Sequence, residues 1–221
     1  MMTRIFWDEV LGSDDERSGE RQKLLDRLNV LEELRTKADY NTGSISFAAA
    51  WCLYSIIRYF APKRVIEIGT FIGKSAVSIL AAMDDRGIAG EIFTCDNSNS
   101  IVIPWQGTSR INQFPKCAST DMLKQLSGTF DFVFLDGRLQ QADLPLLDKL
   151  ITPSTIVCMD DFEGIEKGVA NVMVLGSLPK LRNHFLIYPA SESLLRHRGF
   201  VSHSLIAIFL PTHLIELARQ G

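Results

Sequence analysis

The chain has 221 residues, of which 46% are hydrophobic and 22% charged, a composition typical of a globular protein with a sizeable core. The formal net charge is −3, so electrostatics favours neither nucleic acid nor a membrane surface as partner. The four cysteines form no CxxC pair, which indicates buried thiols in a reducing compartment. The longest apolar-rich run, residues 45–57, is shorter than the roughly 20 residues that span a bilayer. We therefore expect a soluble, cytoplasmic protein.

The first part of the chain predicts helices. Residues 1–19 are mixed and acidic and predict an arm or a short helix. Residues 20–37 form an amphipathic pattern, with five leucines on one face, and residues 45–60 predict a buried helix that ends before Pro62. We assign residues 1–40 to an N-terminal arm and amphipathic helix, and residues 41–221 to the main domain. The two helices would cover a ligand site or form a homodimer contact.

From residue 64 onward, predicted strands alternate with predicted helices. Expected strands are 64–68, 91–95, 130–135, 154–159, 184–189 and 204–210, and expected helices are 74–83, 119–126, 141–150 and 164–178. Residues 97–116 are irregular, with room for a short strand. The alternation predicts an α/β fold with a mostly parallel, doubly wound sheet. The last two strands, with no helix expected between them, are predicted to pair antiparallel at the sheet edge.

The turn after the first strand indicates the kind of ligand. Its glycines are Gly69 and Gly73, and Phe71 stands where a dinucleotide-binding turn needs a glycine close to the pyrophosphate. Glu67 in the same motif disfavours a phosphate. Asp96 ends the next strand, where a carboxylate can accept two hydrogen bonds from a ribose diol. A cationic ligand that contains ribose fits these features, which points to S-adenosylmethionine.

These residues also resemble a known family. The stretch VIEIGTFIGKSAVSIL, the acid Asp96, the ASTD segment of residues 118–121, FDFVFLDG and MDD follow in the order found in class I S-adenosylmethionine-dependent methyltransferases. The stretch is most similar to the catechol and caffeoyl-CoA O-methyltransferase group. The resemblance spans roughly residues 41–161. It implies a Rossmann-like methyltransferase fold, with two N-terminal helices and an antiparallel final strand.

The resemblance implies a role for each matching position. Gly69 would let the chain pass close to the cofactor, and Ser75 with the loop at residues 42–44 would contact the methionine carboxylate. Asp96 would bind the ribose, and Ala118 and Ser119 would border the adenine, although Ser119 also reads as a helix cap. The complete set of expected cofactor-binding residues is Gly43, Ser44, Glu67, Gly69, Thr70, Phe71, Gly73, Ser75, Asp96, Asn97, Ala118, Ser119 and Asp136.

The acids that end the fourth and fifth strands raise the question of a metal. In the resembled group, the acid after the fourth strand and an Asp-Asn pair after the fifth hold Mg²⁺, and Asp160-Asp161 stands where Asp-Asn is usual. Mg²⁺ prefers oxygen ligands and lowers the pKa of a bound hydroxyl. Asp136, Asp160 and Asp161 are the candidate ligands here. Asp160 and Asp161 reach one ion only if the chain turns there, because neighbouring residues of a strand point to opposite faces. The alternative is that one of them caps the following helix.

One position departs from the resembled group. The lysine that serves there as general base is replaced by Leu139, and the adjacent Arg138 is a poor base because it stays protonated. Asp136 is therefore the one catalytic residue we assign. We expect methyl transfer to the hydroxyl of a small-molecule acceptor, with or without Mg²⁺. The alternatives are a nicotinamide-dependent oxidoreductase on a Rossmann sheet and a non-catalytic cofactor-binding protein.

Overall fold

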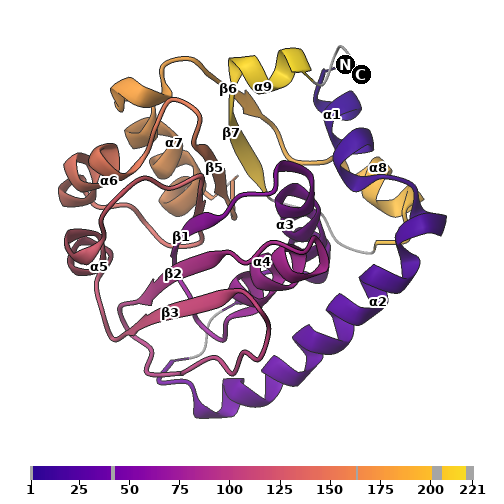
Figure 1. Cartoon of the computed structure of the whole chain (residues 1–221), viewed down its shortest axis with the longest axis horizontal. Coiled ribbons are helices and arrows are strands. Elements are labelled where there is room, and N and C mark those ends of the chain that lie inside the picture. Colours follow the sequence, from indigo (N-terminus) through magenta and orange to yellow (C-terminus); the bar gives the residue numbers. More distant parts are fainter. Residues whose placement is uncertain (1, 41–42, 163, 201–205, 218–221) are drawn as a thin grey trace.

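The computed structural model describes residues 2–40, 43–162, 164–200 and 206–217, without the side chains of residues 2, 14–16, 166 and 215–217. In these ranges the strands form one sheet in the order β3-β2-β1-β4-β5-β7-β6 (Figure 1). Their bounds are β1 Arg64–Ile68, β2 Glu91–Asp96, β3 Arg110–Pro115, β4 Phe132–Leu135, β5 Ile156–Met159, β6 His184–Ile187 and β7 Ala207–Pro211. All pairs from β3 to β5 are parallel, and β7 runs antiparallel to both β5 and β6.

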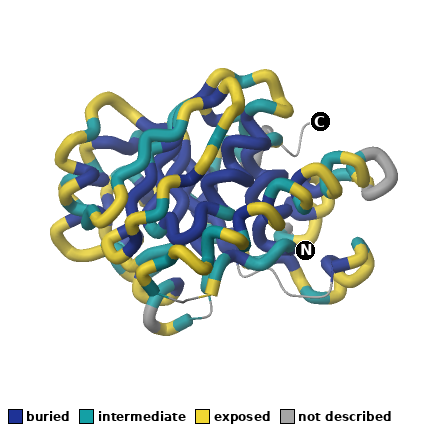
Figure 2. Tube along the Cα trace, turned by 90° about the horizontal axis from the view of Figure 1, so that it is seen from below, coloured by how far each residue is buried: buried dark blue, intermediate teal, exposed yellow. Residues whose placement is uncertain are grey.

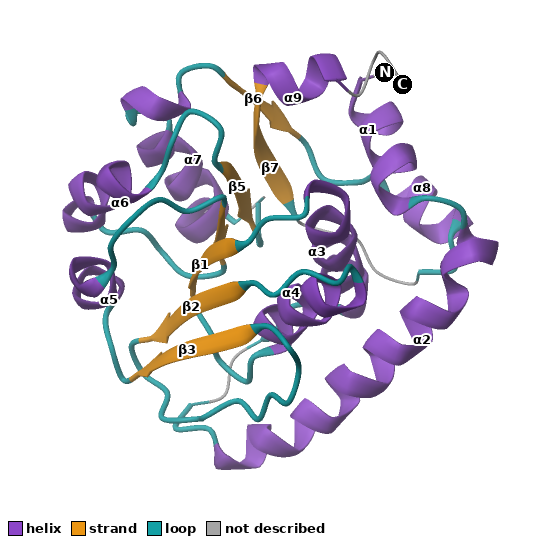
Figure 3. Ribbon diagram, viewed as in Figure 1, coloured by secondary structure: helices purple, strands orange, loops and turns teal. Residues whose placement is uncertain are grey.

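Helices cover both faces of this sheet (Figures 1 and 3). One face packs against α3 (Phe47–Phe60) and α4 (Lys74–Asp85), with α1 (Met2–Leu11) and α2 (Asp14–Leu31) outside them. The other face packs against α5 (Ser119–Gln125), α6 (Leu144–Leu150) and α7 (Ala170–Leu175). Two hydrophobic clusters, one on each face of the sheet, bury the strands, which lie in the centre that Figure 2 shows in dark blue. This double cover explains why β1, β4 and β5 are almost continuously apolar.

The register of the strands brings their ends together. Ile68 at the end of β1 pairs with Cys95 of β2 on one side and with Leu135 of β4 on the other. Asp96, the last residue of β2, and Asp136, the first residue after β4, therefore lie at the same edge of the sheet. In an open parallel sheet, ligands bind at this edge, where the order of connections reverses.

The fold predicted from the sequence is confirmed, including the parallel sheet and the antiparallel final strand. The irregular segment 97–116 contains β3, which pairs with β2 at the edge of the sheet. One expectation was wrong, because a short helix, α8 (Glu192–His197), lies between β6 and β7. Leu194 and Leu195 of α8 are buried, so packing against the core supports a helix in this mainly polar segment.

The N-terminal part also differs in detail from the expectation. For residues 1–19 we expected an arm or a short helix. The structure has a helix there, because α1 extends from Met2 to Leu11 and α2 already begins at Asp14. Trp7 is fully buried, and its indole N–H donates to the carbonyl of Tyr188 at 2.8 Å. A 3₁₀ segment, Glu32–Lys37, follows α2. The domain division at residue 41 and the homodimer contact stay predictions.

The remaining elements complete the chain. A 3₁₀ turn, Gln141–Asp143, precedes α6, a π-helical turn, Ile165–Val169, precedes α7, and a 3₁₀ turn, Pro179–Leu181, precedes β6. The last described helix is α9 (Thr212–Leu217). Among the described helices, none combines the length and the apolar character that crossing a membrane requires.

Candidate active site

Close packing at the ends of β1 and β4 explains the two glycines of the first turn. Gly69 has φ +103°, and a Cβ there would lie 2.8 Å from the backbone nitrogen of Gly137. Gly73 has φ +82°, and a Cβ there would overlap the side chain of Ile103. Both positions therefore exclude other residues, for conformational and for steric reasons. The turn brings the chain after β1 directly against the chain after β4.

Asp96 at the end of β2 is held by donors from three segments. Its Oδ1 accepts the backbone N–H groups of Ser98 and Asn99, each at 2.9 Å. Its Oδ2 accepts the N–H of Phe71 at 2.8 Å and the hydroxyl of Tyr40 at 2.9 Å. A carboxylate offers about four lone-pair positions, so these donors use all of them. Three of the four donors are backbone groups, which fixes the orientation of the carboxylate.

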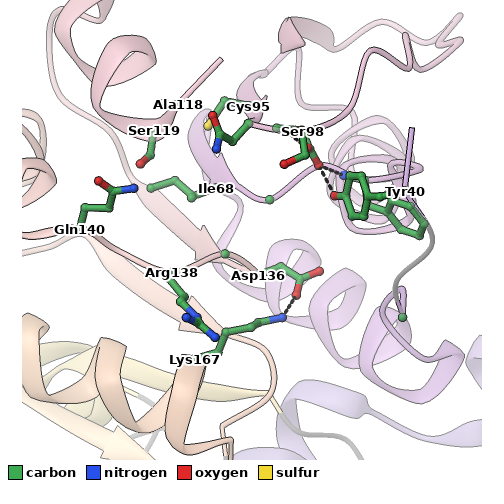
Figure 4. A pocket seen from close by; sticks show the side chains of 16 residues that line it. Tyr40, Ile68, Cys95, Ser98, Ala118, Ser119, Asp136, Arg138, Gln140 and Lys167 are labelled. Atoms are coloured by element: carbon green, nitrogen blue, oxygen red, sulfur yellow. Dashed lines mark hydrogen bonds and ion pairs between the residues drawn. The ribbon is translucent and has the colours of Figure 1, made fainter. Parts of the chain in front are cut away.

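A cavity of about 350 Å³ opens beside Asp96, within the size range of small-molecule sites. Figure 4 shows Tyr40 and Ser98 on one side, Ser119 with Gln140 on the opposite side, and Asp136, Arg138 and Lys167 below them. The residues that line it are Tyr40, Gly43, Ile68, Gly69, Phe71, Cys95, Asp96, Asn97, Ser98, Ala118, Ser119, Asp136, Gly137, Arg138, Gln140 and Lys167. Eight of these were expected from the sequence to bind a cofactor: Gly43, Gly69, Phe71, Asp96, Asn97, Ala118, Ser119 and Asp136.

The other expected cofactor-binding residues lie outside the cavity lining. Ser44 accepts a hydrogen bond from the Arg35 guanidinium at 2.9 Å. Thr70 and Gly73 belong to the turn, where the Gly73 N–H donates to the Thr70 carbonyl at 2.8 Å, and Ser75 is in the first turn of α4. Thr42, which we grouped with Gly43 and Ser44, lies outside the described residues. Their roles in binding a cofactor stay predictions.

Glu67, also outside the lining, is completely buried in the middle of the sheet. Burial raises its pKa to about 8, against the opposing effect of hydrogen bonds from Ser75 and Thr94. Its Oε1 has no hydrogen-bond partner among the described residues. The pKa implies that this carboxyl group is mostly protonated at neutral pH.

Ser119 and Thr120 join the start of α5 to the segment before α6. The helix-cap position of α5 is Ala118. Ser119 therefore does not cap this helix, which was the alternative role that we considered for it. Instead, the Ser119 hydroxyl donates to Asp143 at 2.8 Å and the Thr120 hydroxyl donates to the same carboxylate at 2.5 Å. Asp143 is fully buried, so this network orders the side of the cavity formed by Ala118, Ser119 and Gln140.

At the other end of the cavity, Asp136 pairs with a lysine. Lys167 Nζ lies 2.7 Å from Asp136 Oδ1 and 2.5 Å from Asp161 Oδ2. Burial raises the pKa of Asp136 to about 6, although Lys167 opposes this. Burial alone would lower the pKa of Lys167, but the two carboxylates outweigh it and raise the pKa. Lys167 is therefore a cation enclosed by acids.

Asp160 and Asp161 lie side by side in the chain but in different surroundings. Asp160 is buried, and burial together with the nearby charge of Asp136 raises its pKa to about 7. Asp161 has φ +52°, so the chain does turn at this point, and its side chain reaches Lys167. The following helical turn has Gly164 at its cap position. Neither aspartate therefore caps the helix, which was the alternative to metal ligation.

The residues at this end do not fit a divalent cation well. Three carboxylates are the ligands that Mg²⁺ prefers, but the ammonium group of Lys167 already contacts two of them at ion-pair distance. In the part of the chain that the structure describes, no group of three His, Cys, Asp or Glu side chains converges as a metal-binding set. Metal ligation by Asp136, Asp160 and Asp161 stays a prediction, and the position of Lys167 argues against it.

Sequence reasoning missed several residues of the cavity, chiefly Tyr40, Gln140 and Lys167. Tyr40 precedes the predicted domain by one residue and reaches Asp96 only through the fold. Lys167 belongs to a segment that reads as an ordinary helix. The signal that would have found it is a lysine six residues after the strand-end acid Asp161, because a cation beside an expected metal site competes with the metal.

The comparisons with known proteins agree with this fold. Residues 66–162 match a family model described as a methyltransferase domain. No curated protein matches the chain. The chain is similar to cofactor-bound Rv0187 from MTB, with 16% identity, coverage of 85% of this chain and 90% of that one, and a TM-score of 0.60.

Two further solved structures are similar. A methyltransferase of Podospora anserina, PaMTH1, bound to S-adenosylhomocysteine (SAH), has 17% identity, coverage of 89% and 94% of the two chains, and a TM-score of 0.53. An O-methyltransferase from Bacillus cereus in complex with SAH has 16% identity, coverage of 86% and 90%, and a TM-score of 0.54. At this identity the likeness concerns the fold. Residues 66–162 thus match a methyltransferase domain, and the fold expected from the resemblance to class I S-adenosylmethionine-dependent methyltransferases is confirmed.

Proposed function

We propose that this protein uses S-adenosylmethionine to methylate the hydroxyl oxygen of a small molecule. The observation that supports this most directly is Asp96, a carboxylate fixed by three backbone N–H groups at the edge of a cavity of about 350 Å³. The methyltransferase domain match over residues 66–162 includes this residue. That two similar structures contain SAH is consistent with the same cofactor here.

The lining of the cavity fits the parts of this cofactor. A ribose hydroxyl can donate to Asp96 by replacing the Tyr40 hydroxyl, since the other three donors are fixed backbone groups. Ala118 and Ser119 offer a small-residue surface for the adenine. Gly69 has no side chain, so the cofactor can approach the backbone where the chain leaves β1. The carboxylate of Asp96 gives its side of the cavity the negative charge that a sulfonium favours.

When bound, S-adenosylmethionine supplies an electrophilic methyl carbon on a positively charged sulfur. With an acceptor bound, the methyl group would pass from sulfur to the acceptor oxygen, the C–S bonding electrons would stay on the sulfur of SAH, and the hydroxyl proton would pass to solvent. The protein has to hold the oxygen in line with the methyl group and exclude competing water. Asp136, at the end of β4 within the cavity, is the carboxylate that we expect to orient the acceptor hydroxyl.

Phe71 weighs against the oxidoreductase alternative. It is buried beside Tyr40, with ring centroids 5.2 Å apart. A dinucleotide site needs the backbone at this position to approach a pyrophosphate without a side chain. No observation in the described structure favours that reading over methyl transfer. The non-catalytic alternative differs from our proposal only in turnover, which the experiment below measures.

The test combines binding and turnover. Calorimetric titration with SAH should give a dissociation constant in the range of about 1–100 μM, that is, about −8 to −5 kcal/mol. Incubation with methyl-labelled S-adenosylmethionine and a panel of hydroxylated small molecules should then transfer label to at least one acceptor. Absence of SAH binding at roughly 1 mM would overturn the proposal. Binding of NADH in place of SAH would favour the oxidoreductase, and binding without turnover across the panel would favour the non-catalytic reading.

A further inference from the structure

The cluster formed by Asp136, Asp160, Asp161 and Lys167, here called the lysine–aspartate cluster, lies where the resembled group would hold a metal. Its three carboxylates follow β4 and β5, and the ammonium of Lys167 lies between two of them (Figure 4 shows the contact with Asp136). The Lys167 side chain is 27% exposed and lines the cavity. A cation is therefore present at the acidic end of the cavity, supplied by the chain itself.

The backbone is built to place this lysine. Lys167 belongs to the π-helical turn Ile165–Val169, and turns of this kind often mark functional sites. Gly168 is buried, and a Cβ there would overlap the backbone of residues 161 and 162. The absence of a side chain at Gly168 thus lets the turn lie directly against the chain after β5. Asp161 adopts its left-handed conformation at this contact, which directs its carboxylate to Lys167.

The charge and the geometry of this cluster disfavour the binding of a divalent cation. An ion at this point would have to displace an ammonium that makes two contacts of 2.7 Å and 2.5 Å, and it would lie within a few ångströms of that positive charge. A divalent ion this close to a unit positive charge is repelled by it, and the repulsion is stronger in a partly buried site than in water. Lys167 also has a third N–H donor, and its side chain faces the cavity.

We propose that Lys167 replaces the divalent cation of this site. Its ammonium neutralises Asp136 and Asp161 and offers its third N–H to the acceptor oxygen, so the reaction needs no added metal. The exclusion of metal follows from the lysine–aspartate cluster alone, whereas the contact with an acceptor rests on the function proposed above. The acceptor class is a hydroxylated compound whose reacting oxygen accepts a charged hydrogen bond from lysine.

The experiment measures Mn²⁺ binding by the electron paramagnetic resonance signal of the unbound ion, at pH 7.5. The wild type and Lys124→Ala, which removes an exposed lysine that pairs with Asp121 on α5, should bind no Mn²⁺ below roughly 1 mM. Lys167→Ala and the longer Lys167→Met remove the cation that pairs with Asp136 and Asp161 beside Asp160. Each variant should bind one Mn²⁺ at least about tenfold more tightly than wild type. Lys167→Arg keeps the charge and should bind as weakly as the wild type.

Two outcomes would overturn this proposal. The first is tight, stoichiometric Mn²⁺ binding by the wild-type protein, and the second is absence of a new site in both Lys167→Ala and Lys167→Met when their thermal transitions show folded protein. Methyl transfer that stops when a chelator is added and returns with Mg²⁺ would contradict the proposal that Lys167, rather than a metal, contacts the acceptor oxygen. SAH affinity is measured on the same samples. Wild-type protein that binds neither SAH nor Mn²⁺ would sink the proposed function while leaving the exclusion of metal intact.

Discussion

Asp96 and Asp136 line the same cavity, at the ends of the two strands that flank β1, yet different groups hold the two carboxylates. Asp96 accepts three backbone N–H groups and one side-chain hydroxyl, so the course of the backbone mainly determines its orientation. Asp136 depends on a side chain, Lys167, which comes from a separate segment 31 residues further on. Backbone donors cannot be exchanged by mutation, whereas a side-chain cation can. We therefore expect the cofactor to bind at the Asp96 end of the cavity, which the backbone fixes. We expect the acceptor to bind at the Asp136 end, which side-chain substitutions can change.

The strongest test of this comparison is Asp96→Ala. The substitution removes a carboxylate that charge-assisted hydrogen bonds hold in place, each worth about 1.5–3 kcal/mol. We expect SAH affinity to fall at least about 100-fold, or about 2.7 kcal/mol. Calorimetric titration gives the affinity, and Asp121→Ala, at an exposed position on α5, is the control. An affinity within threefold of wild type would show that Asp96 is not a cofactor ligand and would end the comparison.

Glu67 extends the comparison to an acid that has neither backbone donors nor a lysine. Burial raises its pKa from 4.5 to about 8, so the folded state keeps a proton that the unfolded state loses. The stability from this group is fully present below about pH 4.5 and is lost as pH rises towards 8. Asp136 and Asp160, whose pKa values are also raised, act in the same direction.

Glu67→Gln replaces the protonated acid by a neutral group of the same shape. We expect the free energy of unfolding of the wild type to fall between pH 5 and 8, with up to about 1.4 kcal/mol per pH unit contributed by Glu67. The slope for Glu67→Gln should be smaller. Urea titrations at several pH values measure it, with the exposed Glu33→Gln as the control. Equal slopes for Glu67→Gln and wild type would mean that Glu67 is ionised in the fold.

Gly168→Ala tests whether the position of Lys167 is built into the backbone. The added methyl group would overlap residues 161 and 162, and overpacking of this kind costs about 1–3 kcal/mol. We expect a loss of stability of this size in urea denaturation. Gly176→Ala is the matched control, because a Cβ there comes no closer than 3.5 Å to its neighbours. If both variants were equally stable, the close contact at Gly168 would not hold the turn in place.

Tyr40→Phe is the smallest expected effect and sharpens the account of Asp96. The Tyr40 hydroxyl uses one acceptor position of the carboxylate, which a ribose hydroxyl would also need. Its removal should leave SAH affinity unchanged or raise it by less than about fivefold, equivalent to about 1 kcal/mol. Tyr59→Phe, on α3 away from the cavity, is the control. A tenfold loss of affinity would instead make Tyr40 part of the cofactor site.

The sequence was informative where a local rule determines the structure. Gly69, Gly73 and Asp96 were found because a tight strand-to-helix turn and a strand-end acid have local signatures. Lys167 was missed because its position depends on a π-helical turn and on the missing side chain of Gly168, which no pattern of periodicity reveals. Tyr40 was missed for a similar reason, since 56 residues separate it from Asp96. The helix α8 escaped notice because two leucines are too few to establish a period.

The burial of Trp7 has a consequence for the order of events during synthesis. Its indole N–H meets a carbonyl 181 residues further along the chain. At about 5–20 residues per second, Trp7 is made roughly 10–35 s before this partner. During that interval the apolar side of α1 lacks its final contact and is available to chaperones. The first helix of the chain is therefore among the last to reach its complete set of contacts.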